Sequence, residues 1–386
     1  MNIKPIFTPP PTAEIDARID QVRHAMVKNK LDYYVSFSPD NIFYLTNFAN
    51  TPHERPFVLV IPLQGDISFL IPKLEIPHVS ARSIGELNLI SYREFPAPIG
   101  ESWLDGFHPL FTPGARVGVE SICPLQVYEA IPGERIKLDV IDDLRMVKSD
   151  YEIGRITYAS NIATEVHNNL LENAQLGQTL KSVSAEYSGQ IMRKIIADYP
   201  ETNIAATKFI VVFQPNSVSH DPHNSSNISI EMARGGNTTI INGIANGYGT
   251  EVERTFFLGA VPEQAKKPFD VMTEARQLAY ELTVPGNSMS YVDEQVNQVF
   301  HKAGYEQNLL HRTGHSIGVT GHEAPFLAEG YDRQIEPGMI FTIEPGVYIP
   351  GIGGFRHSDT VLITETGNRA LTSGPETLEE LTYPVN

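Results

Sequence analysis

Residues 148–386 repeat one order of expected elements twice, with two helices followed each time by strand-rich segments. Ser149 opens the first helix, because its hydroxyl and the Glu152 carboxylate three residues later fit a capping box. The second helix pair is expected at residues 269–282 and 291–303, where apolar residues recur at helical spacing before a glycine. This repetition predicts an internally duplicated α+β domain, with its helices covering one face of an antiparallel sheet.

The first part of the chain has a different pattern, in which helices and strands alternate. Residues 32–37 form a short apolar run, and residues 57–62 and 67–72 flank a Gln-Gly-Asp turn that indicates a hairpin. These signals predict an α/β domain. We therefore expect two domains, at residues 1–147 and 148–386.

Charge and cysteine content exclude several classes of protein. The chain has 29 basic and 46 acidic residues, a net charge of −17, so it would repel the phosphate backbone of a nucleic acid. Its apolar runs are too short to span a bilayer, and no signal peptide is visible at the start. Cys123 is the only cysteine, which excludes an internal disulfide. We expect a cytoplasmic protein with a small-molecule substrate and neither nucleic-acid nor membrane partners.

Chemically capable side chains gather in the second half of the chain. His220 and His223 lie in a loop rich in Ser, Asn and Pro. After the Asn-Gly turn at residues 246–247, Glu251 and Glu253 share one face of a strand by its period of two. Two neighbouring carboxylates on one face repel each other unless a cation or a proton lies between them.

Histidines are concentrated further along the chain. His311, His315 and His322 fall within twelve residues, and glycines beside His315 allow a close approach of the backbone. Glu344 ends an apolar strand, and Arg356 lies at a strand start marked by glycines. This concentration predicts a functional site.

The same segments, taken in order, resemble the pita-bread family of aminopeptidase P, prolidase and creatinase. The matching segments are residues 41–46, 146–149, 247–255, 314–318, 322–325, 337–346 and 356–360. The resemblance implies a creatinase-like N-terminal α/β domain and a pseudo-twofold pita-bread C-terminal domain that carries the site. It also implies a homodimer.

The resemblance places the family's metal ligands at altered positions. The peptidases hold two divalent metals with two aspartates, a histidine and two glutamates, which bridge the ions and offset their charge. The histidine and one glutamate match His315 and Glu344. The second aspartate of the family matches Glu251, and its last glutamate matches Ser358. The first aspartate matches Asn242 or Ile240. Counting from the preceding strand gives Asn242, and counting from the Gly-Tyr pair gives Ile240, so a hairpin two residues shorter is expected. We expect no dinuclear centre; a single ion would need Glu251, His315 and Glu344.

Creatinase, which hydrolyses its substrate without metal, offers another comparison. Glu253 matches a creatinase glutamate and would form, with Glu344, an acidic pair for a cationic guanidinium. The proton-transferring histidine matches His220 by the following Asp-Pro, or His223 by its spacing to Glu253. His322 stands where creatinase has the arginine that grips creatine's carboxylate, so creatine itself is not the expected substrate.

These matches lead to one main hypothesis and two alternatives. The main hypothesis is a metal-independent, cofactor-free hydrolase of a C–N bond in a small, partly cationic substrate, with His220 or His223, Glu253 and Glu344 as catalytic residues. His311, His322, Arg356 and Glu251 would bind substrate. The first alternative is a metal-dependent Xaa-Pro aminopeptidase or dipeptidase, and the second is a non-catalytic binding protein on the same fold.

Partner contact is also implied by the resemblance. Dimers of the family send a residue of the first domain into the neighbour's site, and the loop at residues 52–55, including His53 and Arg55, is the counterpart here. A mobile surface loop is an equally good interpretation of this segment.

Overall fold

The computed structural model describes residues 3–51, 53–224 and 227–385. Its packing divides the chain into two compact units, Thr8–Arg145 and a second unit that joins residues 3–7 to Met146 and the residues after it. The first residues therefore pack with the second unit, where the amide of Ile6 donates to the carbonyl of Gly154. The expected domains 1–147 and 148–386 stay a prediction.

The unit Thr8–Arg145 is built on a mixed sheet that has six strands over the described residues, in the order β4-β3-β2-β1-β5-β6. The strands are β1 (Tyr33–Ser36), β2 (Val58–Pro62), β3 (Ser68–Pro72), β4 (Asn88–Tyr92), β5 (Arg116–Val119) and β6 (Glu134–Lys137). The helices are α1 (Thr12–Asn29), α2 (Pro39–Thr46), α3 (Ile76–Arg82), α4 (Trp103–Phe107), α5 (Leu125–Ala130) and α6 (Val140–Leu144). Strands β2 and β3 pair antiparallel, which confirms the predicted hairpin.

The second unit carries the larger sheet, which has nine strands within the described residues and runs β11-β10-β12-β15-β9-β8-β7, with β16 on β15 and β17 on β9. Its strands are β7 (Lys208–Pro215), β8 (Gly235–Ala245), β9 (Tyr248–Leu258), β10 (Gly314–Ser316), β11 (Glu323–Leu327), β12 (Ile340–Ile343), β15 (Ser358–Thr364), β16 (Gly367–Ala370) and β17 (Thr382–Tyr383). A separate ribbon pairs β13 (Gly346–Ile349) with β14 (Gly353–Arg356).

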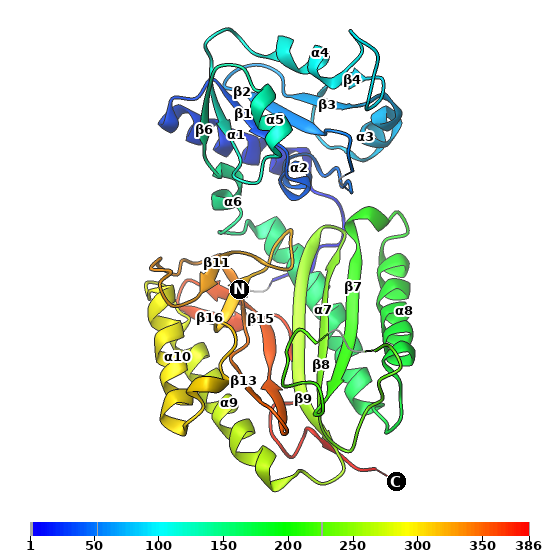
Figure 1. Ribbon diagram of the computed structural model, residues 1–386, viewed down its shortest axis with the longest axis vertical. Coiled ribbons are helices and arrows are strands. Elements are labelled where there is room, and N and C mark those ends of the chain that lie inside the picture. Colours follow the sequence, from blue (N-terminus) through cyan, green and yellow to red (C-terminus); the bar gives the residue numbers. More distant parts are fainter. Residues whose placement is uncertain (1–2, 52, 225–226, 386) are drawn as a thin grey trace. The chain divides into compact units, whose positions relative to one another are not determined.

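Two pairs of helices accompany this sheet: α7 (Asp150–Glu172) with α8 (Leu180–Asp198), and α9 (Glu263–Leu282) with α10 (Met289–Ala303). Figure 1 shows α7 beside strands β8 and β9, and α9 beside α10. The predicted capping box at the start of α7 is present. Each helix pair is followed by strands of the same sheet, and helices and sheet share one apolar core, which confirms the predicted α+β arrangement. No helix in the described ranges has the length and apolar character needed to cross a bilayer.

The β8–β9 hairpin sets the register of the site. Its turn residues, Asn246 and Gly247, have φ of 47° and 92°, as a tight two-residue hairpin turn requires. This turn places Asn242 opposite Glu251 and Ile240 opposite Glu253.

Candidate active site

Side chains from strands β9, β10, β12 and β15 form a buried polar cluster in the second unit. Glu251 and Glu253 lie on one face of β9, as the period of two predicts. Glu344 follows β12, and Ser358 begins β15 opposite Glu253. Their exposed fractions are 4% for Glu251, 2% for Glu253 and 7% for Glu344. Three carboxylates so deeply buried require cations or hydrogen-bond donors around them.

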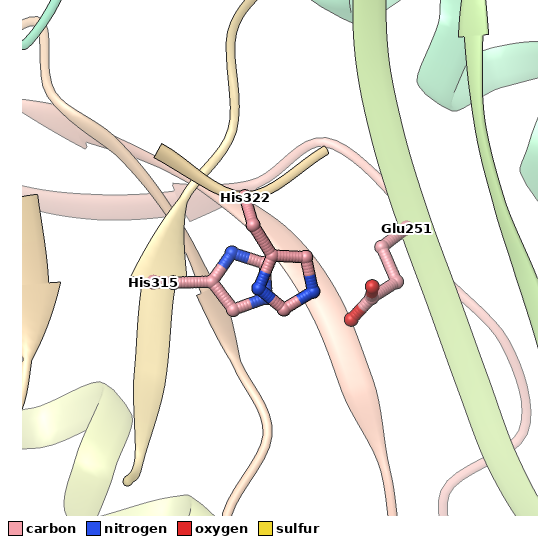
Figure 2. A group of neighbouring side chains, drawn as sticks. All are labelled: Glu251, His315 and His322. Atoms are coloured by element: carbon pink, nitrogen blue, oxygen red, sulfur yellow. The ribbon is translucent and has the colours of Figure 1, made fainter. Parts of the chain in front are cut away.

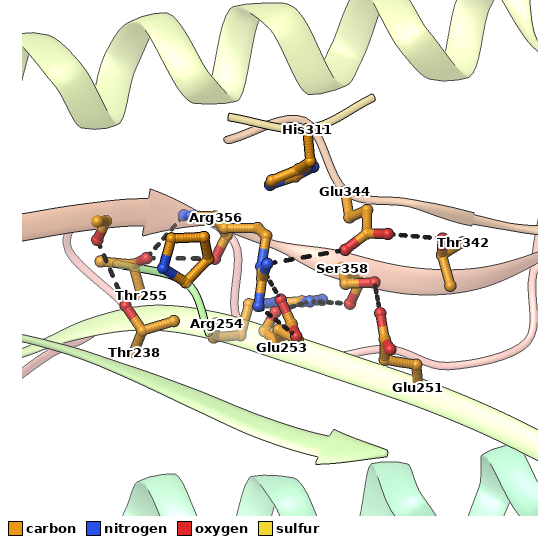
Figure 3. Close-up of polar contacts among 12 residues, drawn as sticks. Thr238, Glu251, Glu253, Arg254, Thr255, His311, Thr342, Glu344, Arg356 and Ser358 are labelled. Carbon is orange, nitrogen blue, oxygen red and sulfur yellow. Dashed lines mark hydrogen bonds and ion pairs between the residues drawn. The ribbon is translucent and has the colours of Figure 1, made fainter. Parts of the chain in front are cut away.

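Glu253 is held by the chain's own arginine. Arg356 donates from Nε and Nη2 to the two oxygens of Glu253, the second bond measuring 2.8 Å. Its Nη1 lies 4.0 Å from Glu344 Oε2 (Figure 3). The pair that was expected to bind a substrate guanidinium therefore already surrounds a guanidinium, and Arg356 is not free to meet an anionic substrate group.

Glu251 accepts hydrogen bonds at both carboxylate oxygens. The Asn242 amide donates to Oε2 at 2.5 Å, and the Ser358 hydroxyl donates to Oε1 at 2.8 Å. Burial raises the pKa of Glu251, and the charge of Glu344 adds to the rise. Asn242, and not Ile240, faces Glu251. This is the residue that results from counting from the preceding strand.

His315 turns one ring nitrogen toward the carboxylates. Its Nδ1 lies 3.0 Å from the carbonyl oxygen of Ser316, an acceptor, so Nδ1 carries a proton. Its Nε2 lies 3.1 Å from Glu344 Oε1 and therefore needs a proton or a metal ion between the two atoms. Burial alone would lower the pKa of His315, but the neighbouring Glu344 and Glu251 raise it. Glu344, although buried, has a pKa well below its usual range because of His315 and Arg356.

His322 stacks on His315. The ring centroids are 3.6 Å apart and the planes differ by 20° (Figure 2). One ligand atom from each of His315, His322 and Glu251 lies within 4.8 Å of the others. Partial burial of the ring, together with the charge of His315, lowers the pKa of His322 to about 4, so this ring is neutral at pH 7.

His311 is oriented by a residue that the sequence did not single out. Its Nδ1 lies 2.8 Å from the carbonyl oxygen of Arg312 and its Nε2 lies 2.6 Å from the hydroxyl of Tyr348, on β13. The carbonyl requires a proton on Nδ1, so the Tyr348 hydroxyl donates to Nε2. Burial lowers the pKa of His311. The only signal for Tyr348 in the sequence was its place four residues after Glu344.

The two loop histidines lie in different surroundings. The charge of His223 lowers the pKa of both His311 and His322, so His223 faces that side of the site. His220 has a buried Nδ1 that finds no hydrogen-bond partner within the described part of the chain. The choice between His220 and His223 as the proton-transferring residue stays a prediction.

The chemistry of these donors decides how many metal ions the cluster suits. Two ions need carboxylates that bridge them, but Asn242 and Ser358 are neutral and direct their hydrogens at Glu251. A dinuclear centre therefore does not fit. One ion fits better, because the Nε2 of His315 points at Glu344 and is buried without a hydrogen-bond partner among the described residues, while Glu251 lies beside both.

The duplicated helices, the single large sheet and the buried His/Glu cluster define a hydrolase of the pita-bread class. The model of metallopeptidase family M24 matches residues 154–365, and that of the creatinase/prolidase N-terminal domain matches residues 18–147. The chain therefore belongs to metallopeptidase family M24.

Named relatives align over nearly the whole chain. A probable dipeptidase PepE from Mycobacterium tuberculosis is 28% identical, with 90% of each chain covered. An Xaa-Pro dipeptidase from Pyrococcus furiosus is 27% identical, covering 92% of this chain and 97% of the relative. The crystal structure of the prolidase from Pyrococcus horikoshii has a TM-score of 0.80 at 25% identity, covering 94% of this chain and 99% of that chain.

These relatives correct the main hypothesis from the sequence. A metal-independent hydrolase of a non-peptide C–N bond was expected, yet the matching family is one of metallopeptidases and the relatives are named as dipeptidases. The physical reason lies in Arg356: the acidic pair that suggested a cationic substrate is neutralised from within the chain. The family also argues against the non-catalytic alternative.

Proposed function

We propose that the protein is a metal-dependent dipeptidase that cleaves Xaa-Pro bonds in small peptides. The observation that carries this proposal is the Nε2 of His315, turned toward Glu344 and Glu251 in a buried cluster. Relatives named as dipeptidases and an Xaa-Pro dipeptidase, which align over nine-tenths of the chain, support it.

One divalent ion is proposed, held by Glu251, His315 and Glu344, with His322 beside them. Such an ion would polarise the peptide carbonyl and lower the pKa of a bound water. The matched positions Asn242 and Ser358 would hold the Glu251 carboxylate in place rather than a second ion.

The chain's own residues would then orient the substrate and handle protons. Tyr348 fixes the ring of His311 through its hydroxyl, so that Nδ1 carries the proton. His322, neutral at pH 7, can accept a proton on the exposed side of the cluster. The neighbouring His315 and Arg356 lower the pKa of Glu344 and so keep its carboxylate ionised.

A homodimer is proposed as well. The contact would use the loop of His53 and Arg55; Pro52, in the same loop, lies outside the described residues. Arg55 pairs with Glu94 at 2.5 Å and with Glu54 at 3.2 Å within its own unit. Light scattering on the purified protein would measure the mass, and a monomer would contradict the dimer.

Proline release from Ala-Pro, with Ala-Ala as the matched non-proline substrate, tests the activity. The protein is first loaded with Mn²⁺, Co²⁺ or Zn²⁺ and its metal content measured. We expect hydrolysis of Ala-Pro that a chelator abolishes and metal restores. A folded, metal-loaded protein that leaves Ala-Pro intact would overturn the proposal.

A further inference from the structure

No carboxylate in the described part of the chain offsets the positive charge of Arg312. This residue lies just before β10, and within the described residues its guanidinium has no ion-pair partner. Its Nε is buried without a hydrogen-bond acceptor. The guanidinium carbon lies 4.3 Å from the ring centroid of Phe326, a cation–π contact that fixes its position but leaves its N–H groups unused.

Four buried cations of the second unit, in contrast, are each paired with a carboxylate. Arg356 binds Glu253, and the ammonium of Lys148 lies 3.2 Å from Glu323. Arg254 and Arg276 both contact Asp359, the first at 2.9 Å. Arg312 differs from these residues because its charge remains available to a ligand.

The pairing of β10 with β11 places Arg312 at the candidate active site. Phe326, which lies under the guanidinium, stands opposite His315 in this pairing, and directly opposed residues share one face of a sheet. The guanidinium therefore lies on the face that bears His315.

We propose that Arg312 binds the free C-terminal carboxylate of the peptide substrate, which deepens and rests on the proposed dipeptidase function. A planar guanidinium binds a carboxylate through two parallel N–H···O bonds, and the Phe326 ring holds it ready for this. A carboxylate bound at this place selects dipeptides over longer or C-terminally blocked peptides.

The test compares Ala-Pro with Ala-Pro-amide, which lacks the negative charge. We expect Arg312→Met to raise the KM for Ala-Pro by about 10- to 100-fold, the loss of charge-assisted hydrogen bonds, while kcat changes little. Turnover of the amide should not change. Arg312→Lys should recover part of the affinity, because it restores the charge without the planar geometry.

Arg135→Met is the matched control. Arg135 also lies over an aromatic ring, 4.9 Å from the centroid of Tyr128, but in the other compact unit. Its replacement should leave both KM values unchanged. Equal KM values for Ala-Pro in the wild type and Arg312→Met would overturn the role of Arg312 and leave the dipeptidase function intact.

A binding measurement separates this inference from the proposed activity. Calorimetry with L-proline and L-prolinamide needs no turnover. Proline binding that is lost in Arg312→Met supports the carboxylate site even if no peptide is cleaved. Equal binding of proline and prolinamide to the wild type would contradict it.

Discussion

Asn242 faces Glu251 across the β8–β9 hairpin, and its amide donates a hydrogen bond of 2.5 Å to the Glu251 carboxylate. An amide at this place binds the carboxylate directly, whereas a second carboxylate would repel it unless a cation lay between them. The pair Asn242–Glu251 is therefore the basis for proposing one metal ion and not two.

The number of bound ions should depend on Asn242 and Ser358, the two neutral residues that bond to Glu251. We expect one divalent ion per chain in the wild type and two in the double variant Asn242→Asp/Ser358→Glu, because the added carboxylates can bridge ions. Elemental analysis after dialysis against Mn²⁺ gives the stoichiometry, and Ser358→Ala serves as a control that adds no ligand. Two ions in the wild type would contradict the single-ion proposal.

Removal of one member of the Arg356–Glu253 pair should destabilise the fold. Arg356→Met leaves a buried carboxylate unpaired, and we expect a loss of about 3–5 kcal/mol in the free energy of unfolding. The double variant Arg356→Met/Glu253→Gln should recover much of this loss, because no unpaired charge remains. Urea denaturation measures all three proteins, and additive effects would show that the two residues are not coupled.

Tyr348→Phe tests the orientation of His311. The variant loses the 2.6 Å hydrogen bond to Nε2 and leaves that nitrogen without its partner, which costs about 1–3 kcal/mol of stability. If the ring of His311 must be oriented for turnover, kcat for Ala-Pro should fall about tenfold with little change in KM. A variant with unchanged kcat would show that the hydroxyl has only a packing role.

His167 predicts acid sensitivity that is independent of the active site. It is fully buried on α7, its Nε2 lies 2.7 Å from the hydroxyl of Thr239, and burial lowers its pKa to about 3. The unfolded chain binds a proton below about pH 6.5 and the folded chain does not, so stability falls as the pH decreases from 6.5 toward 3.

The magnitude of this effect can be measured by urea denaturation at pH 7.5 and pH 5. Between these values we expect His167 to account for a loss of about 2 kcal/mol, which the variant His167→Gln should lack. An equally steep pH dependence in His167→Gln would assign the acid sensitivity to other groups.

Local signals in the sequence predicted local structure well. The capping box at Ser149, the hairpin turn at residues 246–247 and the shared face of Glu251 and Glu253 depend on neighbours a few residues apart. Helix α9 begins at Glu263 rather than near residue 269, and it contains Pro268 as its sixth residue.

Contacts between distant segments could not be predicted from the sequence. Glu253 and Arg356 are 103 residues apart and meet because the end of β14 lies against β9, where the backbone of Arg356 bonds to the Thr255 hydroxyl, so their mutual neutralisation could not be predicted from either motif alone. Tyr348 and Arg312 were missed for the same reason, since their partners depend on which strands become neighbours.

The strict alternation of strand β9 also constrains how such a chain can evolve. Glu251 and Glu253 face the cluster while Arg254, between Glu253 and Thr255, directs its side chain to Asp359 on the other side. Insertion of one residue between the β8–β9 turn and Glu251 would exchange these two faces and bury the wrong charges. Related chains that keep the site should therefore differ in the length of this segment only by even numbers of residues.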